Sequence, residues 1–418
     1  LIALASVPDD AKEPPHDPEG ITLPEGFKWD EWAREPLVPD PVAFTVLPDG
    51  SLFVCESERQ DRGVEDNRYS PYWLLDDLAC TSIEQRLAIY EKWKDKKEGG
   101  MAWFSKYADR VRRLRDTDGD GKADQSTNFS GDLREPLDGT AAGALQVGDA
   151  LWVTSIPHVW RFIDRDRDGV AEVRERLFTG FGVKTSLRGH DMHGLVQGPD
   201  GRIYWSIGDR GYNVKTKEGK VLAASSTGAV FRCEPDGSNL EVFYEGLRNP
   251  QELAFNDAGD LFTVDNNSDA GDKARVCYLP DGGASGWEMP YQTLEGANKR
   301  GPWEQEHLWF VFDPADRVQA AWITPPVAHL TEGPSGFAAY PGTGFPETFR
   351  GTFLITDFLG GDAYSQVWRF GVKPAGAGYQ MVDPEVFIKD VLPTDVEFAP
   401  DGRLYVSDWW NGWQSDGK

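Results

Sequence analysis

The chain has 418 residues, of which 69 are Asp or Glu and 43 are Lys or Arg, so its formal net charge at pH 7 is −26. A surface this acidic repels phosphate backbones and anionic lipids, which argues against nucleic acid or a membrane surface as a partner. The hydrophobic content of 39% is enough for a large folded core, yet no stretch is long and apolar enough to predict a membrane span.

The chain starts with the apolar run Leu1–Ser6 and has no initial Met. Such a start resembles the tail of an export signal, and acidic proteins are often secreted with bound calcium, so we expect a periplasmic or secreted protein. We interpret residues 1–35 as an N-terminal extension and residues 36–418 as one domain. The cysteines lack a metal or haem spacing, and whether they form disulfides stays open; they are Cys55, Cys80, Cys233 and Cys277.

A two-strand pattern recurs six times along the chain. Each copy has an apolar run, a turn at a glycine and a second apolar run, as in Phe44–Val54. The other turns are centred on Gly148, Gly201, Gly259, Gly351 and Gly402. Each copy predicts a β-hairpin, and further apolar runs supply third and fourth strands. Six four-stranded units predict an all-β, six-bladed β-propeller.

The last copy raises a question about how the ring closes. Leu404–Trp413 has the pattern of a second strand, and only a few residues follow it before Lys418. Either the N-terminal segment completes this blade or the natural protein continues beyond this sequence.

Residues 58–110 interrupt the repeats after the first hairpin. Ile83–Trp93 has helical apolar spacing, and Ser82 before it is a candidate N-cap. We therefore expect a helical insertion between the first and second blades that forms a lid or flank near the rim. Trp287–Trp309, rich in Gly, Pro and aromatic residues, is a second candidate wall.

Two acidic loops follow predicted third strands. Their alternating carboxylates are Asp116, Asp118, Asp120 and Asp124 in the first loop, and Asp164, Asp166, Asp168 and Glu172 in the second. Each loop has a glycine at its sixth position, which permits the tight turn that a calcium loop needs. We expect two structural calcium sites on the blade periphery, the alternative being plain acidic turns.

Polar residues gather where first strands start and second strands end, and these positions share one rim of a propeller. The starts carry His190, Asp191, His193, Arg248, Asn249, Gln251, Ser335, Thr394 and Asp395; the ends carry Glu56, Asp209, Asp265, Asn266, Asp357 and Asp408. Asp and Asn are ordinary turn formers at strand ends. Two imidazoles and an arginine are not explained in that way, so we predict a functional funnel at this rim.

The segments Gly189–Gly211 and Gly246–Phe255 resemble the soluble quinoprotein glucose and sorbosone dehydrogenases. Those enzymes are six-bladed propellers that oxidise sugars with calcium-bound pyrroloquinoline quinone. The chain is more closely similar to large dehydrogenase-like proteins of planctomycete and verrucomicrobial bacteria, described as membrane-bound dehydrogenases, whose propeller is often followed by helical repeats and a cytochrome c domain. The resemblance covers roughly residues 44–410 and is specific at the two segments.

The resemblance implies roles for particular residues. The base that removes the sugar hydroxyl proton falls on His190, its partner carboxylate on Asp209 and the arginine near the quinone on Arg248. The calcium-bearing segment falls near Asp265, Asn266 and Asn267. Together with the rim pattern, this gives a candidate cofactor-binding set: His193, Asn249, Gln251, Asp265, Asn266, Asp357 and Asp395.

The sequence also departs from the family. Where the dehydrogenases place a lysine and two arginines against the quinone carboxylates, this chain has Leu359 or Gly360, then Leu392 and Thr394. Acids lie alongside at Asp357 and Asp395. A tri-anionic cofactor is disfavoured beside carboxylates without those cations. Separately, His193 permits a divalent metal site with one of Asp209, Asp265 and Asp357.

Three functions compete at this point. The first is a sugar or polyol dehydrogenase that uses pyrroloquinoline quinone and calcium, with a cytochrome c as the electron acceptor. The second is a carbohydrate hydrolase or lyase, metal-assisted or using His and Arg as acid and base. The third is a non-catalytic, calcium-stabilised glycan-binding module. We favour the first because the base and arginine segments carry the resemblance.

Overall fold

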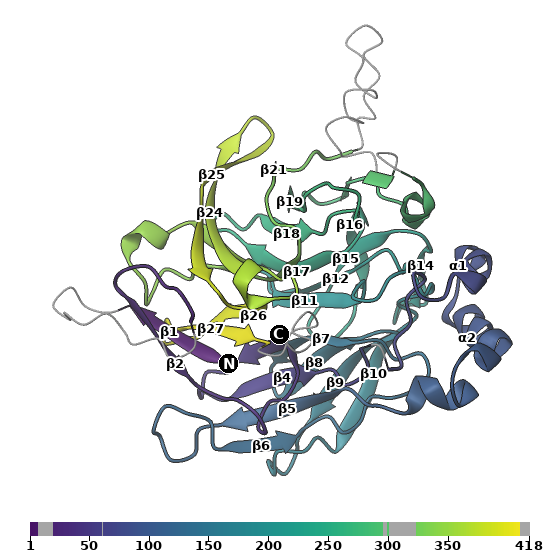
Figure 1. Ribbon diagram of the computed structural model, residues 1–418, viewed down its shortest axis with the longest axis horizontal. Helices are drawn as coiled ribbons and strands as arrows, with labels where there is room; N and C mark the ends of the chain where they lie inside the picture. The colour runs from purple at the N-terminus through teal and green to yellow at the C-terminus, as the bar shows by residue number, and fades with distance from the viewer. Residues whose placement is uncertain (7–19, 61, 296–298, 301–322, 410–418) are drawn as a thin grey trace, which may run out of the picture.

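The structure is a computed structural model that describes residues 1–6, 20–60, 62–295, 299–300 and 323–409. Its strands form six main sheets arranged around a central axis (Figure 1). The predicted all-β, six-bladed β-propeller is thus confirmed.

The first three blades follow the predicted hairpins. Blade 1 contains β3 (Pro41–Val46), β4 (Leu52–Glu56), β5 (Arg110–Arg115) and β6 (Gln125–Asn128). Blade 2 contains β7 (Ala141–Val147), β8 (Ala150–Ser155), β9 (His158–Ile163) and β10 (Val173–Thr179). Blade 3 contains β11 (Met192–Gln197), β12 (Ile203–Ile207), β15 (Gly228–Cys233) and β16 (Glu241–Leu247), with β20 (Gly283–Ala284) at its edge. A separate hairpin, β13 (Tyr212–Lys215) and β14 (Val221–Ala224), projects from it.

The other three blades complete the ring. Blade 4 contains β17 (Pro250–Phe255), β18 (Leu261–Asp265), β19 (Arg275–Tyr278) and β21 (Ala328–His329). Blade 5 contains β22 (Pro334–Ala339), β23 (Thr352–Asp357), β24 (Gln366–Ala375) and β25 (Gly378–Lys389). Blade 6 contains β26 (Pro393–Phe398), β27 (Leu404–Asp408), β1 (Ile2–Ser6) and β2 (Phe27–Glu31).

Blade 6 joins the two ends of the chain. β1 pairs antiparallel with β27, with Leu4 opposite Leu404, and β2 pairs on its other side; in Figure 1 the purple β1 lies beside the yellow β27. The N-terminal segment therefore completes the last blade. This corrects the interpretation of residues 1–35 as an extension, because both of its strands belong to a propeller sheet.

The strands in the middle of the blades are buried on both faces. Every residue of β4, β8, β12 and β18 is buried, since neighbouring blades cover both sides of a sheet. Aromatic side chains fill these interfaces, and Trp205 of blade 3 stacks on Phe178 of blade 2 with ring centroids 5.8 Å apart. Buried tryptophans such as Trp152 and Trp205 therefore serve packing between blades.

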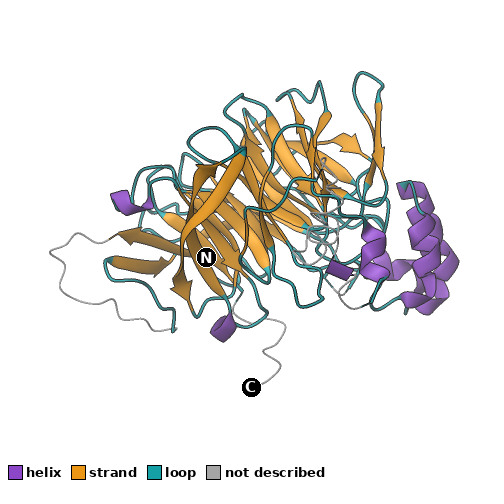
Figure 2. Cartoon of the chain, turned by 90° about the horizontal axis from the view of Figure 1, so that it is seen from above, coloured by secondary structure: helices purple, strands orange, loops and turns teal. Residues whose placement is uncertain are grey.

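The predicted helical insertion is confirmed. It contains η1 (Pro71–Trp73), α1 (Leu74–Ala79), α2 (Ile83–Trp93), η2 (Lys94–Lys96) and η3 (Gly100–Ser105). The Ser82 side chain accepts a hydrogen bond from the Gln85 amide, as its N-cap position requires. These helices project from one side of the disc (Figure 2).

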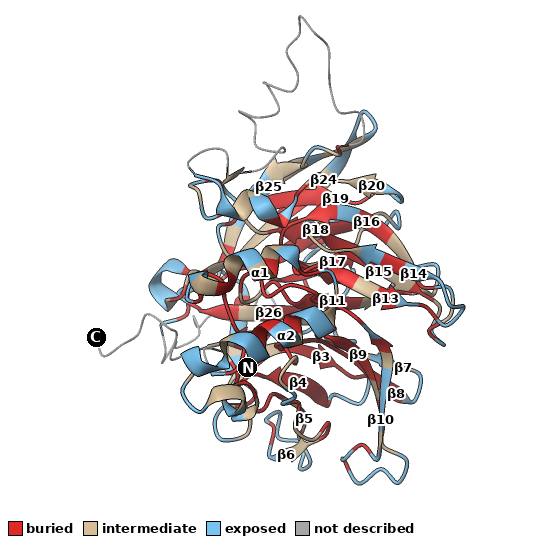
Figure 3. Cartoon of the chain, turned by 90° about the vertical axis from the view of Figure 1, so that its right-hand side faces the viewer, coloured by how far each residue is buried: buried red, intermediate tan, exposed pale blue. Residues whose placement is uncertain are grey.

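The sheet order locates the insertion more finely. We predicted it between the first and second blades. The chain leaves blade 1 after β4 and returns to the same sheet as β5, so the helices lie between the second and third strands of that blade. Figure 3 shows that α1 and α2 expose much of their outer surface.

Three short 3-10 helices lie elsewhere in the described residues: η4 (Met289–Thr293), η6 (Glu347–Phe349) and η7 (Asp362–Tyr364). Within the described part of the chain, no helix has the length and apolar character needed to cross a membrane. The four cysteines are buried and free. Only part of the candidate wall at 287–309 lies within the described residues.

Candidate active site

A cavity of about 540 Å³ opens where the six blades meet. Residues at or next to the start of every first strand line it, among them Pro41, Thr140, His193, Gln251, Ser335 and Thr394. Residues that follow second strands complete the wall, among them Ser57, Asn266, Phe358 and Trp409. Most of the predicted first-strand starts, and one of the predicted second-strand ends, Asn266, therefore line a single cavity.

His190 lies in this wall just before β11 and is bound to a buried carboxylate. Its Nδ1 lies 2.8 Å from Oδ1 of Asp209, which follows β12. Asp209 is fully buried and His190 is 2% exposed. The Ser186 hydroxyl donates to Asp209 Oδ1 at 2.7 Å, and Trp287 Nε1 donates to Oδ2 at 2.8 Å. Ser186 and His190 from one segment and Trp287 from a distant one thus position this carboxylate.

The contacts of this pair favour an ionised Asp209 that accepts the proton on His190 Nδ1. Burial raises the pKa of the Asp209 carboxyl, but the contacts with His190, Arg248 and Ser186 outweigh burial and hold the pKa below its ordinary value. An ionised Asp209 accepts the proton carried on His190 Nδ1. Nε2 is then the ring nitrogen that can accept a proton.

Arg248 lies directly before β17 and is 1% exposed. Its Nε donates to Gln292 Oε1 at 2.8 Å and its Nη2 donates to Asp269 Oδ2 at 3.1 Å. The guanidinium carbon lies 5.8 Å from the ring centroid of Trp287, whose indole also binds Asp209. Among the described residues, Arg248 Nη1 is buried without a hydrogen-bond partner. His190, Asp209 and Arg248 therefore form one cluster.

Four residues of the predicted cofactor-binding set line the cavity: His193, Asn249, Gln251 and Asn266. His193 Nε2 lies 3.1 Å from the Gly189 carbonyl oxygen, and burial lowers the pKa of this imidazole, which keeps it neutral at pH 7. Within the described structure, Asn249 Oδ1 is buried and has no hydrogen-bond partner. Neutral imidazole and amide groups thus surround the cluster.

Three predicted cofactor-binding acids do not line the cavity. Asp265 accepts hydrogen bonds from the amides of Arg248 and Asn249 and from Arg275 Nη2. Asp357 accepts from two amides of the loop before β22. Asp395 accepts from the amides of Phe44 and Val396. This corrects the expectation, because strand-end carboxylates turned inward to satisfy backbone N–H groups are not available to a cofactor.

The divalent metal site predicted at His193 does not form in the described structure. Three groups of described side chains place at least three ligand atoms within 4.8 Å of one another, and none contains His193, Asp209, Asp265 or Asp357. Asp209 binds His190 instead, and Asp265 and Asp357 are engaged as above.

Sequence reasoning missed two cations of the cavity, Arg68 and Arg188. Arg68 belongs to the insertion and forms a bidentate pair with Asp66. The Arg188 guanidinium carbon lies 5.4 Å from the ring centroid of Tyr69. Arg188 stands directly before the segment Gly189–Gly211 and two residues before His190, which was a usable signal. Arg68 lies outside the repeat pattern, so no signal in the sequence indicated that it lines the cavity.

The insertion is bound to the segment that precedes His190. Asp77 of α1 accepts hydrogen bonds from the amides of Thr185 at 2.6 Å and Ser186 at 3.1 Å. Lys184 Nζ donates to carbonyl oxygens of Asp77, Leu78 and Cys80. Because Ser186 binds Asp209, these contacts connect the helices to the His190 pair.

The two acidic loops lie far from the cavity lining, between β5 and β6 and between β9 and β10. Three acids of the first loop gather within 4.8 Å: Asp116, Asp118 and Asp120. All four predicted acids of the second loop do so: Asp164, Asp166, Asp168 and Glu172. Asp124 instead accepts hydrogen bonds from the amide and hydroxyl of Thr117, so it is outside the first group.

Comparison with known proteins decides the family. The family described as "Domain of unknown function (DUF7133)" matches residues 14–415. The chain belongs to this family. This DUF7133 protein is also 29% identical over 128 residues to Quinoprotein glucose dehydrogenase B from Acinetobacter calcoaceticus, and the match covers 24% of this chain and 26% of that protein. The chain therefore spans about a quarter of the length of this curated relative.

Solved structures share the architecture of the DUF7133 protein. A glucose dehydrogenase aligns with a TM-score of 0.57 at 15% identity and covers 90% of this chain and 95% of that one. The PQQ-bound form of an aldose sugar dehydrogenase from Streptomyces coelicolor aligns with a TM-score of 0.52 at 19% identity and covers 91% of each chain. The predicted resemblance to quinoprotein sugar dehydrogenases is thus confirmed, and at these identities the structures support the fold alone.

Proposed function

We propose that this protein is a sugar or polyol dehydrogenase of the pyrroloquinoline-quinone type. The observation that carries the proposal is the cluster in the cavity wall, in which His190 Nδ1 binds the ionised Asp209 and Arg248 lies alongside. The curated relative that matches part of the chain is a quinoprotein glucose dehydrogenase, which agrees with this chemistry.

His190 acts as the base. Asp209 holds the imidazole by Nδ1, so Nε2 accepts the proton of the substrate hydroxyl as the oxygen becomes a carbonyl. The buried carboxylate stabilises the imidazolium that results. Release of the proton to solvent returns His190 to its neutral form.

The cavity residues fit an anionic cofactor that carries a carbonyl group. Arg68 and Arg188 supply positive charge for its carboxylates, and Arg248 Nη1 and Asn249 Oδ1 have no hydrogen-bond partner among the described residues. When bound, pyrroloquinoline quinone would supply the acceptor for the hydride that leaves the sugar carbon. The donor set differs from the family's, because Leu359 and Thr394 line the cavity where cations were expected.

A stacked aromatic pair suits a carbohydrate ring. Phe358 and Trp409 line the cavity with ring centroids 5.8 Å apart, and Trp409 Nε1 donates to Asp40 Oδ1 at 3.2 Å. Aromatic faces bind the apolar faces of sugars, while the polar rim binds their hydroxyl groups. The proposed substrate is therefore a sugar or polyol that enters between the pair and His190.

The two acidic loops are proposed to bind calcium as structural sites on the blade edges. Their gathered oxygen ligands match the preference of a hard cation. Chelation of calcium should lower the midpoint of thermal unfolding, and an unchanged midpoint would exclude this role.

The cellular setting follows from the reaction class. A periplasmic or secreted location and a cytochrome c as electron acceptor agree with the proposed dehydrogenase, whose reduced cofactor must pass its electrons to a second protein. One propeller domain accounts for the described chain.

The decisive experiment is a spectral titration of the purified chain with pyrroloquinoline quinone and calcium, followed by dye-linked oxidation assays on a panel of aldoses and polyols. We expect a bound chromophore and sugar-dependent dye reduction, both weakened by Arg248→Leu. Absence of both would remove the dehydrogenase proposal.

One observation favours a second candidate, a carbohydrate hydrolase or lyase. The positions of the family's cations are neutral at Leu359 and Thr394, and four acids line the cavity: Asp40, Asp191, Asp269 and Glu332. Cleavage of polysaccharides without an electron acceptor would support this candidate. If neither activity exists and glycans still bind, the chain is a glycan-binding module.

A further inference from the structure

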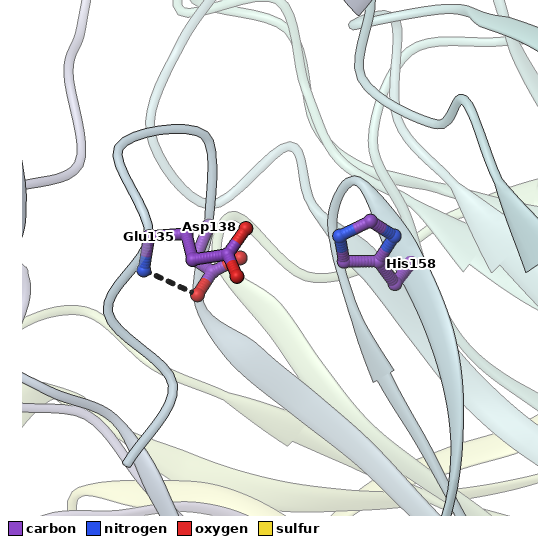
Figure 4. A group of neighbouring side chains, drawn as sticks. All are labelled: Glu135, Asp138 and His158. Atoms are coloured by element: carbon purple, nitrogen blue, oxygen red, sulfur yellow. Dashed lines mark hydrogen bonds between the residues drawn. The ribbon is translucent and has the colours of Figure 1, made fainter. Parts of the chain in front are cut away.

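A histidine and two carboxylates converge at a place that the proposed function does not use. Glu135, Asp138 and His158 each offer a ligand atom, and these atoms lie within 4.8 Å of one another. Figure 4 shows both carboxyl groups on one side and the imidazole facing them across a gap. Glu135 and Asp138 lie in the loop before β7, and His158 is the first residue of β9, so all three belong to blade 2.

The Asp138 carboxylate is the strongest indication that a ligand belongs here. Asp138 and His158 are each 4% exposed. Asp138 Oδ2 accepts a hydrogen bond from the Glu135 amide at 2.7 Å, whereas Oδ1 is buried and has no partner among the described residues. A buried carboxylate oxygen without a donor is costly unless a cation or a water satisfies it.

The imidazole is oriented for the same gap. His158 Nδ1 lies 2.9 Å from the Thr179 hydroxyl, which leaves Nε2 as the nitrogen available to a ligand. Metal-bound histidines are commonly fixed in this way through their other ring nitrogen. Thr179 thus selects the face that His158 presents to the carboxylates.

The loop that carries the two acids is held in place by a buried arginine. Arg59 Nη2 donates to the carbonyl oxygens of Asp138 at 2.8 Å and Glu135 at 3.3 Å, and Arg59 is fully buried. Arg86 of α2 also donates to the Leu137 carbonyl at 2.8 Å. These contacts fix the backbone of the site and connect it to the helical insertion.

One cation competes for the site. Arg176 Nη2 donates to Glu135 Oε1, which engages one oxygen of that carboxylate and leaves the other. Both side chains are largely exposed, so the pair is weak and can open.

We propose that Glu135, Asp138 and His158 form a binding site for a first-row divalent cation of the zinc class, separate from the calcium loops and the active-site cavity. One imidazole nitrogen with two carboxylate oxygens suits zinc, and the nitrogen disfavours calcium or magnesium. Ligands bound at roughly 2.0–2.2 Å lie about 3–3.6 Å apart, so a small movement of the exposed Glu135 closes the site. The ion fastens the loop before β7 to the hairpin β8–β9 beneath the insertion.

The test is a calorimetric titration of the full, chelator-stripped chain with Zn²⁺ in millimolar Ca²⁺, which occupies the acidic loops. One equivalent of Zn²⁺ should bind, and Co²⁺ in its place should give visible absorption bands that report a nitrogen ligand. No binding, or equal competition by Ca²⁺, overturns the proposal.

Variants assign the ligands. His158→Gln and Asp138→Asn should each weaken Zn²⁺ binding at least tenfold, while His329→Gln, at an exposed histidine on β21, should leave it unchanged. Unchanged Zn²⁺ affinity in folded His158→Gln or Asp138→Asn overturns the proposal.

Exposed positions keep the test decisive if a buried variant fails to fold. Glu135→Gln should weaken binding, and Arg176→Gln should strengthen it several-fold because it removes the competing guanidinium. A reversal or absence of both effects shows that these three residues do not hold the ion.

Discussion

The two walls of the cavity differ in charge and in origin. The wall from blades 3 and 4, together with the insertion, carries Arg68, Arg188 and Arg248, as well as both histidines of the rim. The wall from blades 5 and 6 has neutral side chains, two of them aromatic, at Phe358, Leu359, Thr394 and Trp409. A propeller built of related units has thus placed these arginines and histidines on one side of the cavity. The wall from blades 5 and 6 instead carries the stacked pair Phe358 and Trp409.

Of the variants, His190→Asn should have the largest effect on activity, since it removes the proposed base from the wall that carries the arginines. We expect kcat/KM for sugar oxidation to fall by about 10²–10⁴-fold with little change in quinone affinity. Steady-state assays with an artificial dye measure the fall. His329→Asn, outside the cavity, is the control, and a loss of less than about tenfold in His190→Asn would exclude the proposed base.

Asp209→Asn should lower activity by about 10–100-fold, because it removes the charge that fixes the His190 tautomer. The variant should also lose the part of the folding free energy that the ionised Asp209 supplies and that acid removes. The pKa of Asp209 is lower in the folded chain than in the unfolded chain, so its ionised form stabilises the fold above the unfolded pKa. That contribution is lost as pH falls through the folded pKa.

Denaturant unfolding from pH 7 to acid measures this part. The free energy of unfolding of the natural chain should fall more steeply than that of Asp209→Asn once the pH drops below about 4. Parallel curves would show that the carboxylate is not ionised in the folded protein.

Arg68→Gln and Arg188→Gln test whether the charged wall holds the cofactor. Each should weaken pyrroloquinoline quinone binding by about tenfold or more, since a hydrogen bond to a charged group contributes about 1.5–3 kcal/mol. The exposed Arg350, paired with Glu347 on blade 5, provides the control Arg350→Gln. Thr394→Lys should tighten quinone binding. If Thr394→Lys alone changes the quinone affinity while the two arginine variants bind normally, the wall from blades 5 and 6 holds the cofactor instead.

Trp409→Ala should have the smallest effect, confined to the aromatic wall. Loss of the stack with Phe358 should raise KM for the sugar several-fold and leave kcat nearly unchanged, since the pair touches no reacting atom. A fall in kcat with an unchanged KM would place Trp409 in the chemistry instead.

The sequence predicted the architecture because a propeller repeats one local pattern, and a turn glycine between apolar runs is visible without knowledge of contacts. The rim followed from that geometry, so the convergence of His190, Asp209 and Arg248 was predictable from their positions at strand starts and ends. The closure of blade 6 by β1 and β2 was left open, because a strand's partner 400 positions away leaves no local trace.

What remained hidden depends on orientation and on irregular segments. Asp265 and Asp395 stand at strand ends, as Asn266 and Thr394 do, yet their carboxylates turn toward backbone amides. Local spacing does not encode that choice, which depends on which N–H groups lack a strand partner. Arg68 reaches the cavity through an insertion without a repeat, and its position follows only from the packing of the helices.

The pairing of β1 with β27 has a consequence for how the molecule assembles. Until Leu4 meets Leu404, the sheet of blade 6 ends at β27 with unpaired N–H and C=O groups, which is an edge open to self-association. The contact joins strands nearly 400 residues apart, so it is among the slowest to form. The ring is complete only when β1 has paired with β27. Before this contact forms, the ring is therefore open, with five complete blades around the cavity and an unpaired strand edge on blade 6.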